Sequence, residues 1–281
     1  MTLSADGTLQ DGRVLVGPVD APELHVMTYN IRRLFSRYRP GSPDRWANRE
    51  PLIAELLQRE QPALLGTQEA MPTQGRALSH ALGRHYRRIG HGRNADGHGE
   101  GCPTFYDTRR LELTSWRQVA LSDTPAVAGS RSWGNMVPRI AVVADFTDRA
   151  TGLPLRHVNT HFDHLSRRSR EASARMMLEI VAEVQVPTIV AGDTNAGIGT
   201  EPHRLLVESG ALVDAWPAAR ERLTPEWGTW SNYKAPKRTT RRIDWMLVTP
   251  DVEVARVGIN TTRIGGRAPS DHEALQAVVR C

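Results

Sequence analysis

Short apolar runs bounded by turn-forming residues recur along the 281-residue chain. Runs of this length that are rich in Val, Ile, Leu and aromatic residues predict β-strands rather than helices. We expect strands at residues 24–30, 63–69, 102–107, 139–146, 155–162, 188–195, 242–248 and 273–279. Residues 90–101 hold five glycines and two histidines, and they predict an exposed, flexible loop.

Three other segments repeat their apolar positions with the spacing of an amphipathic helix. They are residues 52–60, with Pro51 near the start, residues 169–184, and residues 202–210, which end at Gly210. No repeat of fixed period and no Pro/Gly/Ser linker divides the chain. Many strands with few helices predict an α/β or α+β body with large sheets. We expect residues 1–22 to form a loose N-terminal arm and residues 23–281 a single domain.

Polar side chains stand at the ends of several predicted strands, where burial without partners would be unfavourable. One such residue is typical of a turn. Six such sites in one chain favour convergence on a shared pocket at one edge of the sheets. The residues concerned are Asn30, Glu69, His161, Asp193, Asn195, Asp244, Asp271 and His272.

These residue types indicate a particular chemistry. Carboxylate and carboxamide oxygens are ligands that Mg²⁺ or Mn²⁺ prefers, and histidines transfer protons near neutral pH. The sequence has no G-x-S-x-G motif and no Walker A loop. The set therefore predicts metal-assisted attack of water on an anionic ester, which is the reaction of a Mg²⁺- or Mn²⁺-dependent phosphoesterase.

Composition changes this picture little. The formal net charge of +5 suits an anionic partner, although it is small for a chain of this length. Cys102 and Cys281 make neither a disulfide framework nor a four-cysteine zinc site. No signal-peptide pattern is present, and the longest apolar run, residues 186–192, is too short to span a bilayer. We expect a cytoplasmic monomer without a membrane span.

Six motifs, TYNIR, TQE, NTHFDH, GDTN, RIDW and SDH, follow one another along the chain. In this order they resemble the endonuclease/exonuclease/phosphatase superfamily, to which deoxyribonuclease I belongs. The resemblance extends from about residue 24 to residue 280, and NTHFDH is similar to a bacterial subgroup. It implies a four-layer sandwich, in which two packed mixed β-sheets are flanked by helices and the site lies at one rim.

The resemblance also implies roles for individual residues. Asn30, Glu69 and Asp271 match the metal site, with Glu69 as the strongest ligand and Asn30 nearer to the phosphoryl oxygen or a metal-bound water. Asp193 and Asn195 match the pair that holds the attacking water and steadies the phosphorus. His272 matches the histidine that faces the scissile phosphate, and Asp244 the carboxylate that orients it.

His161 is implied to face the phosphate from the opposite side, as an acid for the leaving oxygen or as a hydrogen-bond donor to the transition state. Glu100 stands where similar proteins carry the carboxylate that pairs with this histidine. Asn159, which we also predict to bind substrate, shares a strand face with His161 and Asp163. Asp163 either braces the site or, like Ser166, caps the helix that follows.

Residues 229–245 interleave basic and aromatic side chains directly before Asp244. This composition suits a nucleic-acid strand or a sugar or nucleotide phosphate, although it is also that of a solvated loop. The chain shows no second basic tract, so we favour a small or accessible phosphomono- or diester over DNA or RNA. A nuclease is the alternative, and a non-catalytic phosphoester-binding protein is a third reading. The predicted substrate contacts here are Trp230, Tyr233, Lys237, Arg238 and Arg241.

Overall fold

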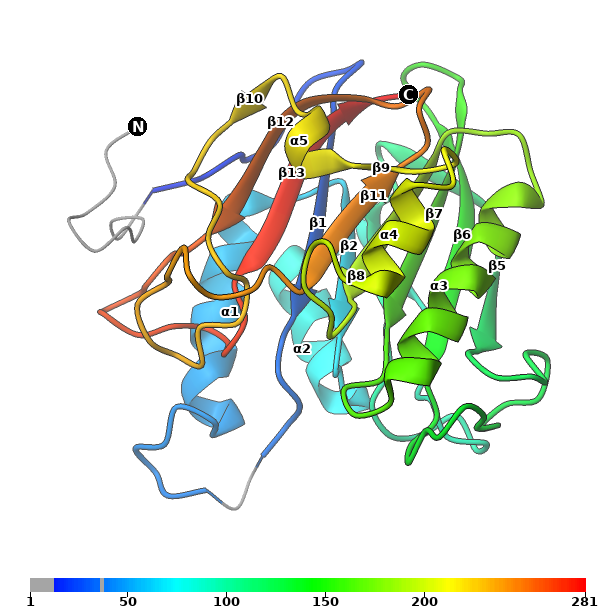
Figure 1. Ribbon diagram of the computed structural model, residues 1–281. Helices are drawn as coiled ribbons and strands as arrows, with labels where there is room; N and C mark the ends of the chain where they lie inside the picture. Colours follow the sequence, from blue (N-terminus) through cyan, green and yellow to red (C-terminus); the bar gives the residue numbers. More distant parts are fainter. Residues whose placement is uncertain (1–12, 36–37) are drawn as a thin grey trace.

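Two β-sheets face each other in the computed structural model, which describes residues 13–35 and 38–281 (Figure 1). In sheet order, the first contains β10 (Glu221–Arg222), β12 (Glu253–Asn260), β13 (Ala274–Arg280), β1 (Leu24–Asn30), β2 (Leu64–Gln68), β4 (Thr104–Asp107) and β3 (Tyr86–Ile89). The second contains β5 (Leu111–Ala120), β6 (Ile140–Asp148), β7 (Pro154–His161), β8 (Thr188–Asp193), β11 (Asp244–Val248) and β9 (Val213–Asp214).

Helices cover the outer face of each sheet. An apolar cluster that includes Met27 and Ile53 joins the first sheet to α1 (Trp46–Glu60) and α2 (Pro72–Leu82). A second cluster, with Val158 and Met177, joins the second sheet to α3 (Arg167–Ala182) and α4 (Glu201–Val207). The largest cluster lies between the sheets, and α5 (Ala215–Ala218) packs at its edge. The order helix, sheet, sheet, helix confirms the predicted four-layer sandwich.

The central strands are buried on both faces, which explains their continuous apolar sequences. Every residue of β1, β2, β8 and β11 is buried. All eight predicted strands are present, with ends shifted by at most two residues. The predictions missed strands β3, β5, β9, β10 and β12 and helices α2 and α5. The exposed face of β5 is polar, and the sequence of α2 contains Gly75. Helix α1 begins at Trp46, so Pro51 lies inside it rather than near its start.

The predicted N-terminal arm falls partly on residues 1–12, which lie outside the described residues. Its described part is tied to the first sheet layer through Glu60. The carboxylate of Glu60 accepts hydrogen bonds from the backbone N–H groups of Leu15 (2.8 Å) and Gly17 (3.0 Å). Among the described residues, no helix is both long and apolar enough to cross a membrane.

The second sheet brings three predicted site residues to one edge. Strands β7 and β8 run parallel, so that His161 and Asp193 are paired at their C-terminal ends. Strand β11 runs antiparallel to β8, and its first residue, Asp244, is paired with Asp193. The strand ends therefore place an imidazole and two carboxylates side by side.

The first sheet contributes to the same edge. Strands β1 and β2 run parallel and end at Asn30 and Gln68, so Glu69 directly follows the paired residues. Strand β13 runs antiparallel to β1 and begins shortly after His272. Because the sheets pack face to face, these groups stand opposite those of the second sheet.

Candidate active site

Asp193 stands at the centre of the polar strand ends. Its Oδ2 accepts a hydrogen bond from Nδ2 of Asn30 (2.9 Å) and lies 3.6 Å from Nε2 of His161 and 3.7 Å from Nε2 of His272. Its Oδ1 accepts the backbone N–H of Asn195 (2.9 Å). Asn30 and His272 flank the first sheet, whereas Asp193 lies on the second. The site is therefore formed where the two sheets meet.

His272 and Asp244 are in contact, as the sequence predicted. Nδ1 of His272 lies 2.8 Å from Oδ2 of Asp244, and both side chains are buried. Burial alone would lower the pKa of His272, but the carboxylates of Asp244 and Asp193 raise it well above its ordinary value. His272 is therefore an imidazolium at neutral pH, and its Nε2–H lies on the side of Asp193.

Burial raises the pKa of Asp193 to about 7, and the neighbouring carboxylate of Asp244 adds to the shift. The charge of His272 and the hydrogen bond from Asn30 oppose it without cancelling it. A carboxylate with a pKa near neutrality can accept a proton and release it again, as a general base must.

His161 differs in charge from His272. Nδ2 of Asn195 donates to the carbonyl oxygen of Phe162 (3.1 Å), which fixes the amide so that the same nitrogen donates to Nε2 of His161 (3.0 Å). Burial, followed by the positive charge of Arg139, lowers the pKa of His161 well below its ordinary value. The pKa shifts make His272 the more basic of the two imidazoles, and the acid role of His161 stays a prediction.

The predicted pair of Glu100 and His161 is not the one that the structure forms. Oε1 of Glu100 lies 2.7 Å from Nη1 of Arg33, and Oε2 lies 2.9 Å from Nη2 of Arg93. Two guanidinium groups attract a carboxylate more strongly than a neutral imidazole does. Glu100 and His161 line one small cavity together, so they are neighbours with different partners.

Glu69 and Asp271 present carboxylates to the same pocket, as predicted for the metal site. The carboxylate of Glu69 accepts hydrogen bonds from the backbone N–H of Arg33 (2.9 Å) and from Nδ2 of Asn30 (3.2 Å). Burial alone would raise the pKa of Glu69, but the Arg33 amide and the charge of His272 lower it. Carboxylate oxygens at the rim of a polar pocket fit a hard divalent cation such as Mg²⁺ or Mn²⁺.

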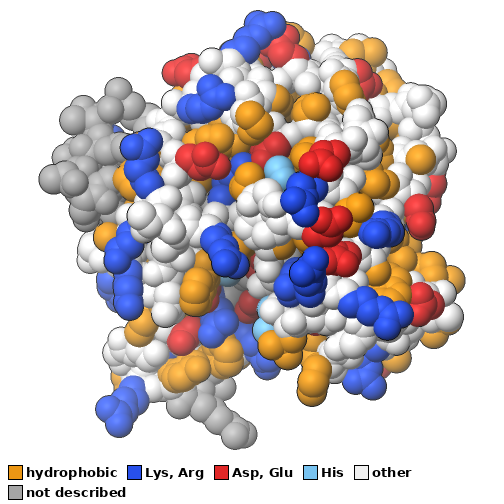
Figure 2. All heavy atoms as spheres, viewed as in Figure 1, with side chains coloured by type: hydrophobic (Ala, Val, Ile, Leu, Met, Phe, Trp, Pro, Cys, Tyr) orange, Lys and Arg blue, Asp and Glu red, His pale blue; other side chains and the backbone are white. Residues whose placement is uncertain are grey.

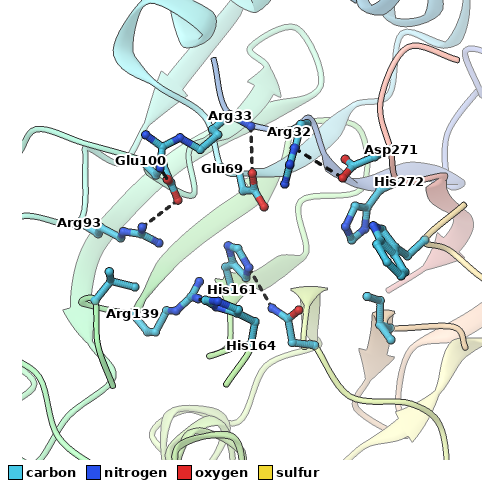
Figure 3. Close-up of a pocket in the computed structure, with 14 residues that line it drawn as sticks. Arg32, Arg33, Glu69, Arg93, Glu100, Arg139, His161, His164, Asp271 and His272 are labelled. Carbon is cyan, nitrogen blue, oxygen red and sulfur yellow. Dashed lines mark hydrogen bonds and ion pairs between the residues drawn. The ribbon is translucent and has the colours of Figure 1, made fainter. Parts of the chain in front are cut away.

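Asn30 serves this site through its amide nitrogen rather than through a free oxygen. Its Oδ1 accepts the backbone N–H of Arg32 (2.9 Å), while its Nδ2 donates to Glu69 and Asp193. Asn30 therefore couples the metal-side carboxylate to Asp193. The side chain of Arg32, which the sequence analysis did not single out, lies beside these groups, with Nε 3.6 Å from Oδ2 of Asp271 (Figure 3).

A second set of donors could also hold a metal ion. Asp193, Asp244 and His272 offer ligand atoms that all lie within 4.8 Å of one another. Nδ1 of His272 is already hydrogen-bonded to Asp244, and the raised pKa values of His272 and Asp193 place protons in this cluster. The site thus offers two sets of donors to a metal ion, this one and the pair of Glu69 and Asp271.

Glu69, Asp271 and His272 line a pocket of about 550 Å³ that has an acidic side and a basic side, and Asp193 and Asp244 are buried behind His272. Figure 3 shows Glu69 and Asp271 across the pocket from Arg93, Arg139 and His164. Arg139 is 3 % exposed, and its Nη2 lies 2.7 Å from Nδ1 of His164. Its Nη1 is buried and has no hydrogen-bond partner among the described residues.

The sequence analysis placed Arg93 in a flexible loop, so it missed most of the basic side. In the structure that loop is closed by a bridge between Gly92 and Gly101, and the ion pair with Glu100 holds Arg93 at the pocket. The one signal in the sequence was that residues 90–101 contain both Arg93 and Glu100, which can form an ion pair. Glycine-rich composition alone does not distinguish a mobile loop from a tightly folded one.

Asn159 was predicted to bind substrate, and the structure places it between the two sheets instead. It is fully buried and does not line the pocket. Its Nδ2 donates to the carbonyl oxygens of Thr67, Cys102 and Pro103, and its Oδ1 accepts from Nε2 of Gln68 (2.7 Å). Asn159 therefore bonds the second sheet to the first.

The residues predicted from the basic segment before β11 separate into groups. Trp230 is 50 % exposed and lines the catalytic pocket. The hydroxyl of Tyr233 donates to Asp44 (2.9 Å), which anchors the segment. Arg238 and Arg241 line a neighbouring hollow, whereas Lys237 is exposed and lines none of the pockets described here.

The capping alternative for the residues after NTHFDH is confirmed for Ser166. Ser166 is the N-cap of α3, and its side chain accepts the backbone N–H of Ser169 (3.1 Å). Asp163 does not cap the helix but shapes the turn before it and contacts Arg139. Its Oδ1 accepts the backbone N–H groups of Leu165 and Ser166, and its Oδ2 lies 3.2 Å from Nε of Arg139.

The sequence matches the model of one protein family, described as the endonuclease/exonuclease/phosphatase family, over residues 27–272. No curated protein matches it. A structure from Bacteroides thetaiotaomicron, described as a mannosyl-6-phosphatase, shares 30 % identity, with 92 % of this chain and 100 % of that chain covered and a TM-score of 0.84.

Two further solved structures extend the comparison. An endonuclease/exonuclease/phosphatase from Bacteroides vulgatus shares 28 % identity, with 92 % of this chain and 98 % of that chain covered and a TM-score of 0.85. The human Nocturnin catalytic domain, solved with a sulfate anion, shares 20 % identity, with coverages of 93 % and 95 % and a TM-score of 0.69. The likeness to Nocturnin is one of fold.

Proposed function

The chain belongs to the endonuclease/exonuclease/phosphatase family, and from that premise we propose that it hydrolyses a small phosphoester with the help of a divalent metal ion. The observation that carries the proposal is the position of Asp193. This carboxylate, with a pKa of about 7, lies between an imidazolium and a neutral imidazole, and Asn30 links it to Glu69. The arrangement suits activation of water beside a phosphorus atom.

Each group has a distinct part in the reaction. Asp193 takes a proton from the attacking water, whose oxygen bonds to phosphorus as the P–O bond to the alcohol breaks, and the departing alkoxide takes a proton from solvent. The Nε2–H of His272 stabilises the charge that develops on the phosphoryl oxygens. Asp244 keeps His272 protonated and oriented. Mg²⁺ or Mn²⁺ held by Glu69 and Asp271 would supply further charge stabilisation at the phosphoryl group.

The basic side of the pocket favours a phosphomonoester. Guanidinium groups bind the oxygens of phosphate in a bidentate manner, and a monoester carries more charge than a diester. Arg93 and Arg139 line this side, Arg33 lines the pocket beside Glu69, and Glu100 holds Arg33 and Arg93 in place. The relative described as a mannosyl-6-phosphatase supports the same preference.

Nucleic-acid cleavage is the second candidate, because exposed Trp230 at the pocket could stack on a base. A long polyanion would require a continuous basic track. Figure 2 shows acidic and basic side chains mixed over the face that it presents. This distribution favours a small substrate.

The test measures turnover of a chromogenic phosphomonoester and a chromogenic phosphodiester, with Mg²⁺, with Mn²⁺ and after exhaustive chelation. We expect the monoester to be preferred and chelation to abolish turnover reversibly. Glu69→Gln should lower kcat by at least about a thousandfold, since a metal ion stabilises the transition state by several kcal/mol. Glu50→Gln, which removes an exposed carboxylate on α1, is the matched control.

Two results would contradict the proposal. Full activity after chelation would show that the reaction does not require a metal ion. Tight binding of phosphoesters without turnover, with Mg²⁺ or Mn²⁺ present, would show a binding protein instead.

A further inference from the structure

Two hollows lie beside the catalytic pocket, and the loop that follows β8 and the segment that precedes β11 contribute to both. The nearer has a volume of about 320 Å³ and shares Asn195 with the catalytic pocket. The farther has a volume of about 400 Å³ and shares Gly197, Gly199, Thr200 and Arg241 with the nearer one. Together they form a groove that adjoins the catalytic pocket, and we call it the arginine groove.

Arg241 stands where the two hollows meet, and backbone contact sets its position. Its side chain lies over Gly197, where a Cβ atom would come 3.1 Å from Cδ and 3.4 Å from Cγ of Arg241. A larger residue at position 197 would therefore push Arg241 away. The glycine lets the guanidinium-bearing chain lie along the loop that carries Asn195.

Guanidinium groups outnumber carboxylates along this groove. Arg238 and Arg241 are exposed and form no ion pair with any residue in the described part of the chain. Arg170 donates to the backbone carbonyl of Asp163 (2.9 Å). The arginines with carboxylate partners are Arg167 with Glu171, Arg204 with Glu201, and Arg242 with Asp214 and Glu226.

Two residues that line the farther hollow also carry buried donors without acceptors. Nη1 of Arg242 and Nε1 of Trp227 are buried and have no hydrogen-bond partner among the described residues. Arg242 is 4 % exposed, and Asp214 (2.7 Å) and Glu226 (3.1 Å) fix its other nitrogens. A buried donor without an acceptor is unfavourable, so an oxygen brought to it by a ligand would be stabilising.

Surplus guanidinium groups and unpaired donors match the oxygens of a phosphate, sulfate or carboxylate group. Trp227 and Ile198 add apolar surface beside them for the body of a small organic molecule. We infer that the arginine groove is an anion-binding subsite, and that the substrate carries a second anionic group besides the ester cleaved at Asp193. A sugar bisphosphate has this chemistry. The inference rests on the proposed function, because it places the reacting ester in the catalytic pocket.

The test compares a hexose monophosphate with the corresponding hexose bisphosphate. The wild-type enzyme should hydrolyse the bisphosphate with a kcat/KM at least about tenfold higher. Arg241→Gln should raise KM for the bisphosphate by about tenfold to a hundredfold, the loss expected for a charge-assisted hydrogen bond, and leave the monophosphate within about twofold. Arg168→Gln, which removes an exposed guanidinium of α3 outside both hollows, should change neither substrate by more than about twofold.

Three kinetic results would overturn the inference. The first is equal hydrolysis of the two substrates by the wild-type enzyme. The second is an equal effect of Arg241→Gln on both, which would show a structural role. The third is a clear preference for a single-stranded oligonucleotide, lost in Arg241→Gln, which would assign the groove to a nucleic-acid strand.

Binding separates a failure of this inference from a failure of the proposed function. If none of the esters is hydrolysed, the proposed function fails, and affinities are then measured by calorimetry in the Asp193→Asn background. The bisphosphate should still bind at least about tenfold more tightly than the monophosphate, and Arg241→Gln should remove that difference. Equal affinities would overturn the subsite.

Discussion

The catalytic pocket and the arginine groove are built from different kinds of residue. In the pocket, Asp193, Asp244 and His272 stand at the ends of buried strands, and each is held by a partner from another strand. In the groove, Arg238 and Arg241 are exposed loop residues without an ion-pair partner among the described residues. On the proposed function, residues at the strand ends carry out the reaction, whereas loop residues select the substrate. The two properties should therefore change separately under mutation.

After Glu69→Gln, the largest effect should come from Asp193→Asn. Asparagine keeps the shape of the side chain but cannot take a proton from water, so kcat should fall by at least about a hundredfold. Steady-state kinetics and thermal unfolding of the same preparation measure this. Because burial already disfavours the charged form of Asp193, the melting temperature should not fall. Near-normal turnover in the folded variant would contradict the role of Asp193 in the reaction. The control is Asp251→Asn, which changes an exposed aspartate.

In a pH profile, kcat/KM should change about tenfold for each pH unit outside the optimum. Asp193 must be ionised to accept a proton and its pKa is about 7, so kcat/KM should fall as the pH drops below that value. His272 must stay protonated, and its raised pKa places the loss of activity at alkaline pH. Asp244→Asn removes one of the carboxylates that raise the pKa of His272 and should move the alkaline limit to lower pH. An unmoved alkaline limit would exclude His272 as the group that sets it.

Arg93→Gln should have the smallest effect and would sharpen the comparison. Arg93 lines the catalytic pocket but comes from a loop, so it should behave like a substrate-selecting residue. We expect KM to rise about fivefold, as for a partly exposed charged contact, with kcat within about twofold. Arg168→Gln again serves as the control. A large fall in kcat would instead place Arg93 in the reaction itself.

The strand ends account for most of what the sequence could predict. A buried run that ends in a polar residue fixes both the strand and the position of its last side chain. Asn30, Glu69, Asp193 and His272 accordingly lie together in the structure. The contact of His272 with Asp244 followed from the same pattern.

What could not be predicted depends on contacts between segments far apart in the chain. Glu100 has Arg33 and Arg93 as partners, and nothing in the local sequence indicates that two arginines compete for it with His161. Asn159 lies in the same motif as His161, yet it faces the other sheet. Strand β5 escaped detection because a register shift between Leu113 and Ser115 breaks the alternation of apolar and polar residues.

The hydrogen bonds of Asn159 between the two sheets have a consequence for how this protein would lose its activity. Asp193 is on one sheet, whereas Glu69 and Asp271 are attached to the other, and Gly66 of β2 leaves just enough room for Asn159 to join them. A slight shear between the sheets would pull the two halves of the pocket apart while every strand stayed intact. Turnover should therefore depend on the alignment of the two sheets. On gentle warming, we expect kcat to fall at a lower temperature than the circular dichroism signal of the secondary structure.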